Sequence, residues 1–303
     1  MLTSAIGRYL DLRRALGYKL DSAEYILRGF ARLAESRSET HVTIRTAVEW
    51  ASHTRTARQR AKRIGVLIGF ARFLHAEDPQ HEVPPPELGP KAPRPLPYIF
   101  SRDELRRLAT AATDLGPPES MRALTFSTLF NLLAVTGLRI SEALSLRLED
   151  FTPDGLFIRE TKFHKSRLVP LHETTSAALN RYLQRRLKVP VKHDRLFVSS
   201  RYTQPLCYEH VRCTFRQLCL RAGILGPAAG PRPRLHDIRH TAAVRALEAC
   251  PGSRKQVTPH MLALSTYLGH SSVRATYWYL HTSPQLMADI AAAGESWLRG
   301  DAP

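Results

Sequence analysis

Hydrophobic residues recur three and four positions apart through residues 1–77, the spacing that places side chains on one face of an α-helix. One such stripe consists of Tyr25, Ile26, Phe30 and Leu33. The pattern predicts an all-helical first domain over 1–77. Its helices are expected over residues 3–16, 21–36, 43–53 and 55–76.

The last of these predicted helices has a basic end on an apolar stem. Its positive charges precede the apolar run and belong to Arg55, Arg58, Arg60, Lys62 and Arg63. Such an end suits contact with the phosphates of a nucleic acid. An ordinary charged face in contact with water explains the same residues equally well.

Periodicity stops over residues 78–98, where the sequence DPQHEVPPPELGPKAPRPLPY is crowded with proline. Proline-rich segments of this kind are extended and semi-rigid. The sequence therefore predicts a linker here, followed by a second domain over residues 99–303.

The second domain is predicted to be α+β. It opens with Ser101 and Glu104 in the S-x-x-E spacing of a helix capping box. Two strands, over 156–160 and 167–171, form a hairpin, and 196–200 is strand-like. Further helices are predicted over 119–135, 173–187, 208–222, 236–249, 258–268, 272–281 and 284–298. The expected fold is therefore mainly α with a small β-sheet.

The excess of basic over acidic residues indicates which kind of partner the chain binds. The chain has 44 Lys and Arg against 27 Asp and Glu, a formal net charge of +17, and residues 1–90 hold only 14 and 10 of these. The second domain thus carries most of the positive field, which makes nucleic acid the first candidate partner, with an anionic membrane surface as the rival. No apolar run is long enough to cross a bilayer, and residues 1–20 do not resemble a signal peptide, so a cytoplasmic location is expected.

Four separated segments hold residues suited to binding one phosphodiester. In TGLRISEALSL, residues 136–146, Gly137 ends a helix and Arg139 follows in an apolar setting. A partly buried arginine needs an anionic partner. A phosphate is one candidate, and Glu142, three residues further on, is the structural alternative.

The second segment is RLHDIRHTAAVRAL, residues 234–247. His236, Arg239 and His240 share one helix face, where imidazoles can exchange protons and a guanidinium can grip phosphate oxygens. The two histidines have the spacing of a zinc-binding HExxH helix, but the glutamate is missing and Arg239 would repel a cation. No metal is therefore predicted.

The remaining segments are YLGHSSVRATYWYLH, residues 267–281, and ETKFHKSRLVPL, residues 160–171. The first places His270 in a turn, with Tyr277 and Tyr279 on the helix that follows. The second is a hairpin with three basic residues, Lys162, Lys165 and Arg167, which alone would read as an exposed basic loop.

Together these segments resemble the tyrosine recombinase (phage integrase) family. The shared order is an arginine in a TGLRxSE box, a hairpin lysine before VPL, HxxRH, and then LGHSS followed by a tyrosine. The resemblance covers about residues 100–285 and extends more loosely to 1–77, as a helical core-binding domain. The catalytic residues that it implies are Arg139, Lys162, His236, Arg239, His270 and the nucleophile Tyr279.

Two of these assignments have local rivals. Tyr277 lies about 200° around the helix from Tyr279, so both cannot face one phosphate, and the family spacing after His270 selects Tyr279. The hairpin lysine of the family is flanked by glycines, whereas Lys162 lies between Thr161 and Phe163. Lys165 is therefore the alternative lysine.

The resemblance implies a reaction through a covalent 3′-phosphotyrosine, without metal or nucleotide cofactor. It also implies four protomers assembled on two DNA sites. The segment 284–303 could dock on a neighbouring protomer through Leu286, Ile290 and Trp297, or pack within its own chain. Whether the sites belong to a phage, a transposon, an integron or a chromosome is left open.

Three alternative functions remain at this point. A type IB topoisomerase would use the same nucleophile to relax supercoils without strand exchange. A DNA-binding protein with a decayed site would lack cleavage. A zinc-dependent hydrolase would use His236 and His240 as metal ligands.

Overall fold

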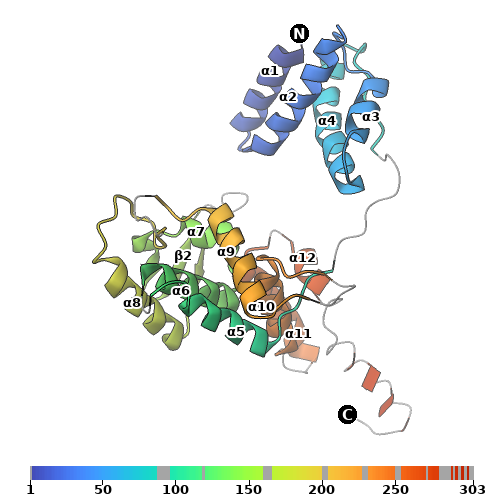
Figure 1. Ribbon diagram of the computed structural model, residues 1–303. Helices are drawn as coiled ribbons and strands as arrows, with labels where there is room; N and C mark the ends of the chain where they lie inside the picture. Colours follow the sequence, from blue (N-terminus) through green and yellow to red (C-terminus); the bar gives the residue numbers. More distant parts are fainter. Residues whose placement is uncertain are drawn as a thin grey trace. The chain divides into compact units, whose positions relative to one another are not determined.

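The computed structural model describes residues 2–86, 96–117, 120–159, 166–199, 204–226, 231–249, 254–270 and 272–279, with isolated positions beyond them. The chain divides into two compact units, Met1–Arg94 and Pro95–Pro303 (Figure 1). The division falls within the proline-rich segment 78–98.

The first unit is a helical bundle, as the hydrophobic pattern predicts. Its helices are α1 (Leu2–Ala15), α2 (Asp21–Ser36), α3 (Ile44–Ser52) and α4 (Ala57–Glu77), each within two residues of its predicted bounds. Leu27, Phe30, Leu67 and Phe70 are fully buried among them. Tyr25 departs from the prediction: its side chain is 76% exposed. The buried face of α2 runs through Ile26, Leu27 and Phe30, and Tyr25 lies beside that face.

The basic end of α4 also stabilises the bundle. The Arg63 guanidinium lies 4.6 Å from the centre of the Trp50 ring and donates to the Trp50 carbonyl oxygen at 2.9 Å. Lys62 Nζ donates to Ser22 Oγ at 2.6 Å. Arg55 and Arg58 remain exposed. Two of the five residues expected on DNA therefore already have contacts within the bundle.

The second unit combines helices with a small sheet, which confirms the predicted fold class. Its elements are α5 (Arg102–Thr113), α6 (Met121–Thr136), α7 (Ile140–Ser145), η1 (Leu148–Asp150), β1 (Phe151–Thr152), β2 (Gly155–Ile158), β3 (Arg167–Val169), α8 (Glu173–Arg186), α9 (Tyr208–Arg221), α10 (Asp237–Glu248), α11 (Arg254–Leu268) and α12 (Arg274–Tyr277).

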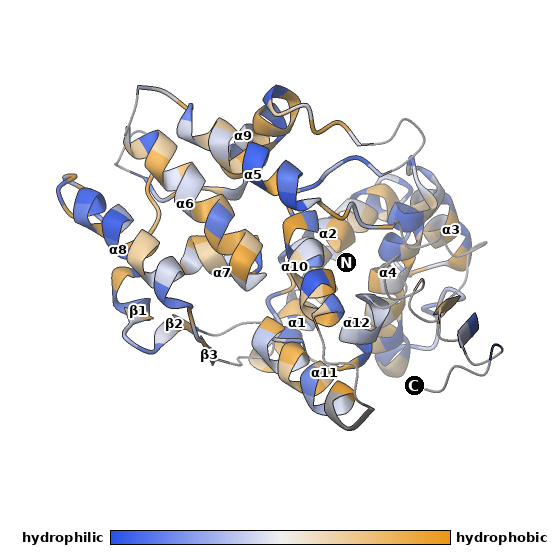
Figure 2. Cartoon of the chain, turned by 90° about the horizontal axis from the view of Figure 1, so that it is seen from below, coloured by the Kyte–Doolittle hydropathy of each residue, from blue (hydrophilic) through white to orange (hydrophobic). Residues whose placement is uncertain are grey.

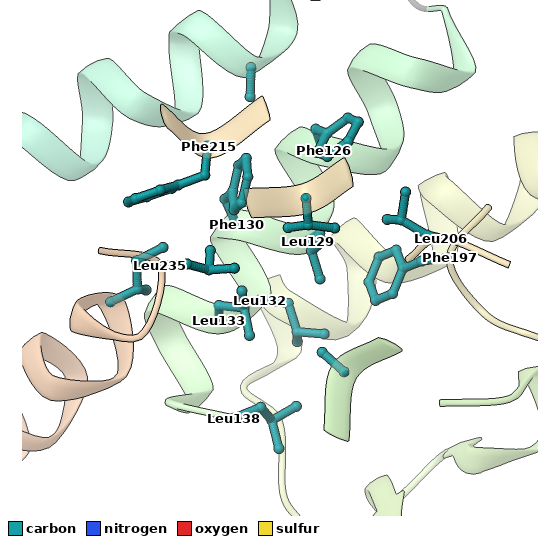
Figure 3. Packing of buried hydrophobic residues seen from close by; sticks show 14 of the residues in the cluster. Phe126, Leu129, Phe130, Leu132, Leu133, Leu138, Phe197, Leu206, Phe215 and Leu235 are labelled. Atoms are coloured by element: carbon teal, nitrogen blue, oxygen red, sulfur yellow. The ribbon is translucent and has the colours of Figure 1, made fainter. Parts of the chain in front are cut away.

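Helix α6 lies at the centre of this unit. It is rich in apolar residues, and nine of its sixteen residues are buried, although Asn131 and Val135 are exposed. It contacts α5, α8 and α10, and Figure 3 shows Phe126 and Phe130 of α6 packed in one cluster with Phe215 of α9. Helix α10, by contrast, carries hydrophobic and hydrophilic residues side by side (Figure 2), as a helix between a core and a polar site must.

Capping residues set the ends of the helices that matter for the site. The predicted capping box of α5 is present: Ser101 Oγ accepts from the Glu104 backbone N–H at 3.1 Å, and Glu104 accepts from the Ser101 N–H at 2.8 Å. Helix α6 ends at Gly137, whose φ of +62° is the left-handed conformation that glycine adopts most readily.

The sheet has the order β1-β2-β3 with antiparallel pairing. Leu156 pairs with Val169 and Ile158 pairs with Arg167, whereas Phe157 and Leu168 point to the exposed face. Because paired residues share a face, Arg167 points inward with the buried residues. Strand β1 was not predicted, and the expected strand over 196–200 is reduced to a single bridge between Val198 and Pro205.

Several predictions fall outside the described residues. The tip of the hairpin with Lys162 and Lys165 is one, and most of the expected helix over 284–298, with Leu286, Ile290 and Trp297, is another. The described part of the helix expected over 272–281 is α12, followed by residues 278–279 in 3₁₀ geometry. None of the described helices combines the length and the apolar composition needed to span a membrane.

Candidate active site

Arg139 follows the end of α6 and stands at the N-terminus of α7. Its Nη1 donates to Glu142 Oε1 at 2.7 Å, and its Nη2 donates to the Gly269 carbonyl oxygen at 3.0 Å. The structural partner expected from the sequence is therefore present. The guanidinium is nevertheless held in place by a second contact, with a residue that is 130 positions away in the chain.

Arg239, on α10, is almost completely buried. Its Nη1 donates to the Gly137 carbonyl oxygen at 2.7 Å and its Nη2 to the Leu268 carbonyl oxygen at 2.8 Å. Burial, and then the positive charge of Arg139, lower the pKa of Arg239 to about 10. The side chain is therefore still a cation at neutral pH, and two carbonyl groups from distant helix ends fix its orientation.

Arg167 differs from its predicted role as an exposed DNA-binding residue. Its side chain is only 11% exposed. Its Nη1 donates to Glu142 Oε1 at 3.1 Å and its Nη2 to Glu142 Oε2 at 2.9 Å. The reason is the register of the sheet, which pairs Arg167 with Ile158 on the inner face. Burial alone would raise the pKa of Glu142, but hydrogen bonds and charges from Arg167 and Arg139 outweigh it and hold that pKa below its usual range.

The C-terminal end of α11 connects the three arginines. Successive carbonyl oxygens accept from a different arginine each: Tyr267 from Arg167 Nε at 2.9 Å, Leu268 from Arg239, and Gly269 from Arg139. The end of a helix leaves such carbonyls without intrahelical partners and carries partial negative charge, so it attracts cations. One helix terminus therefore sets the spacing of the cationic groups.

Gly269 is expected to be the least replaceable residue of this terminus. Its φ is +67°, and an added Cβ would lie 2.5 Å from Arg167 Nη1. The Arg167 guanidinium cannot move aside without losing its hydrogen bonds to Glu142 and to the Tyr267 carbonyl oxygen. We expect Gly269→Ala to lower the free energy of unfolding by roughly 1–3 kcal/mol more than the left-handed backbone strain alone.

Gly223→Ala is the matched control for this prediction. Gly223 has a similar φ of +65°, but its added Cβ would lie 3.4 Å from the end of the flexible Arg107 side chain. Denaturant unfolding of the two variants therefore separates crowding from backbone strain. Equal destabilisation would contradict the role given to the Arg167 contact.

Tyr279 lies in the same site within its own chain. The ring is 3% exposed and packs against the rings of His240 at 5.4 Å, Trp278 at 5.4 Å and His270 at 5.9 Å. Its hydroxyl is close enough to Arg239 that a negative charge there would raise the pKa of Arg239. Tyr277, the rival nucleophile, is the last residue of α12 and is 52% exposed.

Two histidines flank the tyrosine and the arginines. His270 Nδ1 lies 2.8 Å from Thr276 Oγ1, and burial followed by the charges of Arg239 and Arg139 lowers the pKa of His270 to about 4. His236 is exposed to solvent, and its ring centre lies 4.6 Å from that of His240. Desolvation by the surrounding protein, and then the positive charge of Arg239, lower the pKa of His236 as well. Both imidazoles are therefore neutral at pH 7, so each can accept a proton and donate one.

The lowered pKa of His270 predicts a change of stability with pH. A pKa below the usual 6.5 means that the unfolded chain binds the proton more readily. The stabilising effect of the neutral ring is therefore complete above pH 6.5 and is lost as the pH falls towards 4. His270→Gln should reduce the slope of unfolding free energy against pH in this window by up to about 1.4 kcal/mol per pH unit, with no change in slope above it. An unchanged slope between pH 6.5 and 4 would contradict this.

Sequence reasoning missed two contributors to the site. The inward orientation of Arg167 could have been inferred by pairing the two predicted strands, since Ile158 and Arg167 then share a face. Thr276 had no such indication, because a threonine within a helix is unremarkable until its hydroxyl is found beside His270.

The first unit holds a separate group of possible metal ligands. His41 Nε2 is 3.2 Å from Asp78 Oδ2, and His81 lies beside them. However, His81 Nδ1 accepts a hydrogen bond from the Val42 N–H at 3.0 Å, so its proton is on Nε2 and blocks that nitrogen as a ligand. Among the described residues, no comparable group includes His236 and His240.

Comparison with known proteins identifies the family. The model of the phage integrase family matches residues 99–285, more than half of the chain. A Sinorhizobium fredii protein classed by its name as an integrase/recombinase, y4rB, is 38% identical over 94% of both chains. The tyrosine recombinase XerD of Caulobacter vibrioides is 31% identical over 76% of this chain and 72% of its own.

Solved structures agree on the fold. The XerH recombinase in its post-cleavage complex with a difH substrate superposes with a TM-score of 0.68 at 19% identity, covering 91% of this chain and 80% of that one. The Tn1549 transposon integrase has a TM-score of 0.67 at 16% identity, covering 95% and 98%. The chain therefore belongs to the phage integrase family of tyrosine recombinases, enzymes that cleave DNA strands and rejoin them.

Proposed function

We propose that this recombinase cuts a DNA strand by attack of Tyr279 Oη on a phosphodiester and then joins that strand to a new partner. The observation that supports this is the convergence of Tyr279 with Arg139, Arg239, His236 and His270 in one unit of one chain. They come from segments spread over 140 residues, and attack on a phosphodiester explains why cations and neutral imidazoles surround one buried phenol.

The arginines would bind the non-bridging oxygens of the phosphate. An anionic phosphodiester repels nucleophiles, and charge builds up on its oxygens in the transition state. Guanidinium groups that are already oriented by fixed carbonyl partners stabilise that charge without reorganising during the reaction. Arg139 and Arg239 each use two donors on carbonyl or carboxylate oxygens and have others left for phosphate.

Proton transfers would accompany the exchange of bonds. The Tyr279 hydroxyl loses its proton as Oη bonds to phosphorus, and neutral His236 is the acceptor in this scheme. The 5′ oxygen leaves with the electrons of the broken P–O bond and takes a proton, a role that the family resemblance gives to Lys162, with Lys165 as the alternative. The 3′-phosphotyrosine conserves the phosphodiester bond energy, so attack by another 5′ hydroxyl needs no nucleotide.

Double-stranded DNA is the proposed partner and four protomers the proposed assembly. Solved relatives with this fold include XerH bound to difH and a lambda integrase tetramer bound to a Holliday junction. The chain's net charge of +17 suits such a partner. In the first unit, Arg55, Arg58, Arg60, Lys62 and Arg63 are the proposed phosphate contacts, and the enzyme is proposed to act in the cytoplasm.

The test uses the full-length protein and DNA that flanks its gene. A substrate nicked beside the scissile phosphate loses a short fragment after cleavage, so the covalent adduct accumulates and can be seen by denaturing electrophoresis. A wild-type protein that binds this DNA but forms no adduct would contradict the proposal. A plasmid with two sites then separates the alternatives: recombinant products indicate strand exchange, and relaxation alone indicates a topoisomerase-like activity.

A further inference from the structure

Thr276 has a fully buried hydroxyl next to a catalytic-site histidine. It lies on the four-residue helix α12, three positions before Tyr279, and its Oγ1 is 2.8 Å from His270 Nδ1. The proposed mechanism above does not use this hydroxyl. It is nevertheless the direct polar link between the turn with His270 and the helix that leads to Tyr279.

The burial of Thr276 decides the direction of this hydrogen bond. A hydroxyl has one proton to donate and two lone pairs that can accept. In the described part of the chain, His270 Nδ1 is the hydrogen-bond partner of Thr276 Oγ1. If Oγ1 accepted from an Nδ1–H group, its own proton would be buried with no acceptor, which is unfavourable. The hydroxyl therefore donates, and Nδ1 accepts.

The charges around His270 leave the ring with a single proton. Arg239, Arg139 and Arg167 face it, and Glu142 is the negative group near them. Together with burial, the three cations disfavour imidazolium. A neutral imidazole whose Nδ1 accepts must be protonated on Nε2. We propose that Thr276 is a positioning residue that holds His270 as the neutral, Nε2-protonated tautomer.

This tautomer matters because of where the ring is held. It stacks on Tyr279 with an angle of 20° between the planes, and the His270 backbone N–H donates to the Ser265 carbonyl oxygen at 3.0 Å. In the proposed reaction, a phosphate bound by Arg139 and Arg239 would lie beside His270, whose Nε2–H would then donate to a non-bridging oxygen. The other tautomer would turn a lone pair towards that oxygen and repel it. The inference thus rests on the proposed function for its catalytic consequence, but not for the tautomer itself.

The tautomer can be measured without DNA. In protein labelled with ¹⁵N-histidine, the signals that disappear in His270→Gln belong to His270, and their nitrogen shifts report which nitrogen carries the proton. We expect one Nε2–H form in the wild type and in Thr276→Ser, which keeps the hydroxyl. Thr276→Val, which has the same shape without a donor, should show a mixture of tautomers. An Nδ1–H form in the wild type would overturn the proposal.

Cleavage of the nicked substrate gives an independent readout. Thr276→Val should slow adduct formation by roughly five- to tenfold, the equivalent of one net hydrogen bond, and Thr276→Ser should restore it. In a His270→Gln variant, the glutamine side-chain amide donates from the position of Nε2 with or without the Thr276 hydroxyl. Adding Thr276→Val to this variant should therefore not slow adduct formation further. An equal loss in both backgrounds would mean that Thr276 only packs α12, and would overturn the proposal. A wild type without any adduct would instead contradict the proposed function and leave the measured tautomer standing.

Discussion

Replacing Tyr279 by phenylalanine is expected to abolish the covalent protein–DNA adduct and to leave DNA binding unchanged. The substitution removes only the hydroxyl that is proposed to attack phosphorus. The ring keeps its contacts with His240, Trp278 and His270, so the fold of the site should be preserved. Adduct formation on a nicked substrate, together with a gel-shift titration on the uncut site, measures both parts of the prediction.

Tyr277→Phe is the matched control, because it makes the same chemical change two residues away on an exposed side chain. It should form adducts at the wild-type rate. If Tyr277→Phe lost the adduct while Tyr279→Phe retained it, the assignment of the nucleophile would be wrong.

Arg239→Ala is expected to have the second largest effect. Removing a preorganised donor to a transition-state oxyanion slows the chemical step by about 100- to 1000-fold. The variant should also be less stable, because the Gly137 and Leu268 carbonyl oxygens lose their partner inside the protein, at about 1–3 kcal/mol for each group left unsatisfied. Single-turnover cleavage and denaturant unfolding measure the two effects separately.

Arg245→Ala controls for the loss of positive charge on the same helix. Arg245 pairs with Glu248 and its side chain is 56% exposed, so a change in stability within about 0.5 kcal/mol is expected. Arg239→Lys adds a further comparison, since a single ammonium cannot reproduce the planar two-pronged geometry that spans both carbonyls. Wild-type cleavage in Arg239→Lys would show that charge alone is sufficient and that the carbonyl contacts do not matter.

The predictions that succeeded from sequence depend on neighbours within a few residues. The four helices of the first unit follow from apolar residues three and four apart, and the capping box at Ser101 and Glu104 follows from a fixed spacing. The pairing of Arg139 with Glu142 is likewise local. Strand β1, with only two residues, was too short to show a pattern, and Tyr25 was misplaced because it borders the apolar stripe of α2.

By itself, the sequence determined most of the local elements and the order of the motifs, and the family spacing within it led to the proposal of Tyr279 rather than Tyr277. Only the tertiary structure decided how the cationic groups are held, because their partners are backbone carbonyl oxygens at the end of α11. Every residue has such a carbonyl, so the pattern of side chains does not reveal which carbonyls will accept from an arginine. The contact of Arg167 with the Tyr267 carbonyl oxygen was likewise decided by the tertiary structure, whereas its inward orientation already follows from the pairing of the two predicted strands. The physical reason is that the unpaired carbonyls at the end of a helix bring together groups about 30 to 130 positions apart in the chain.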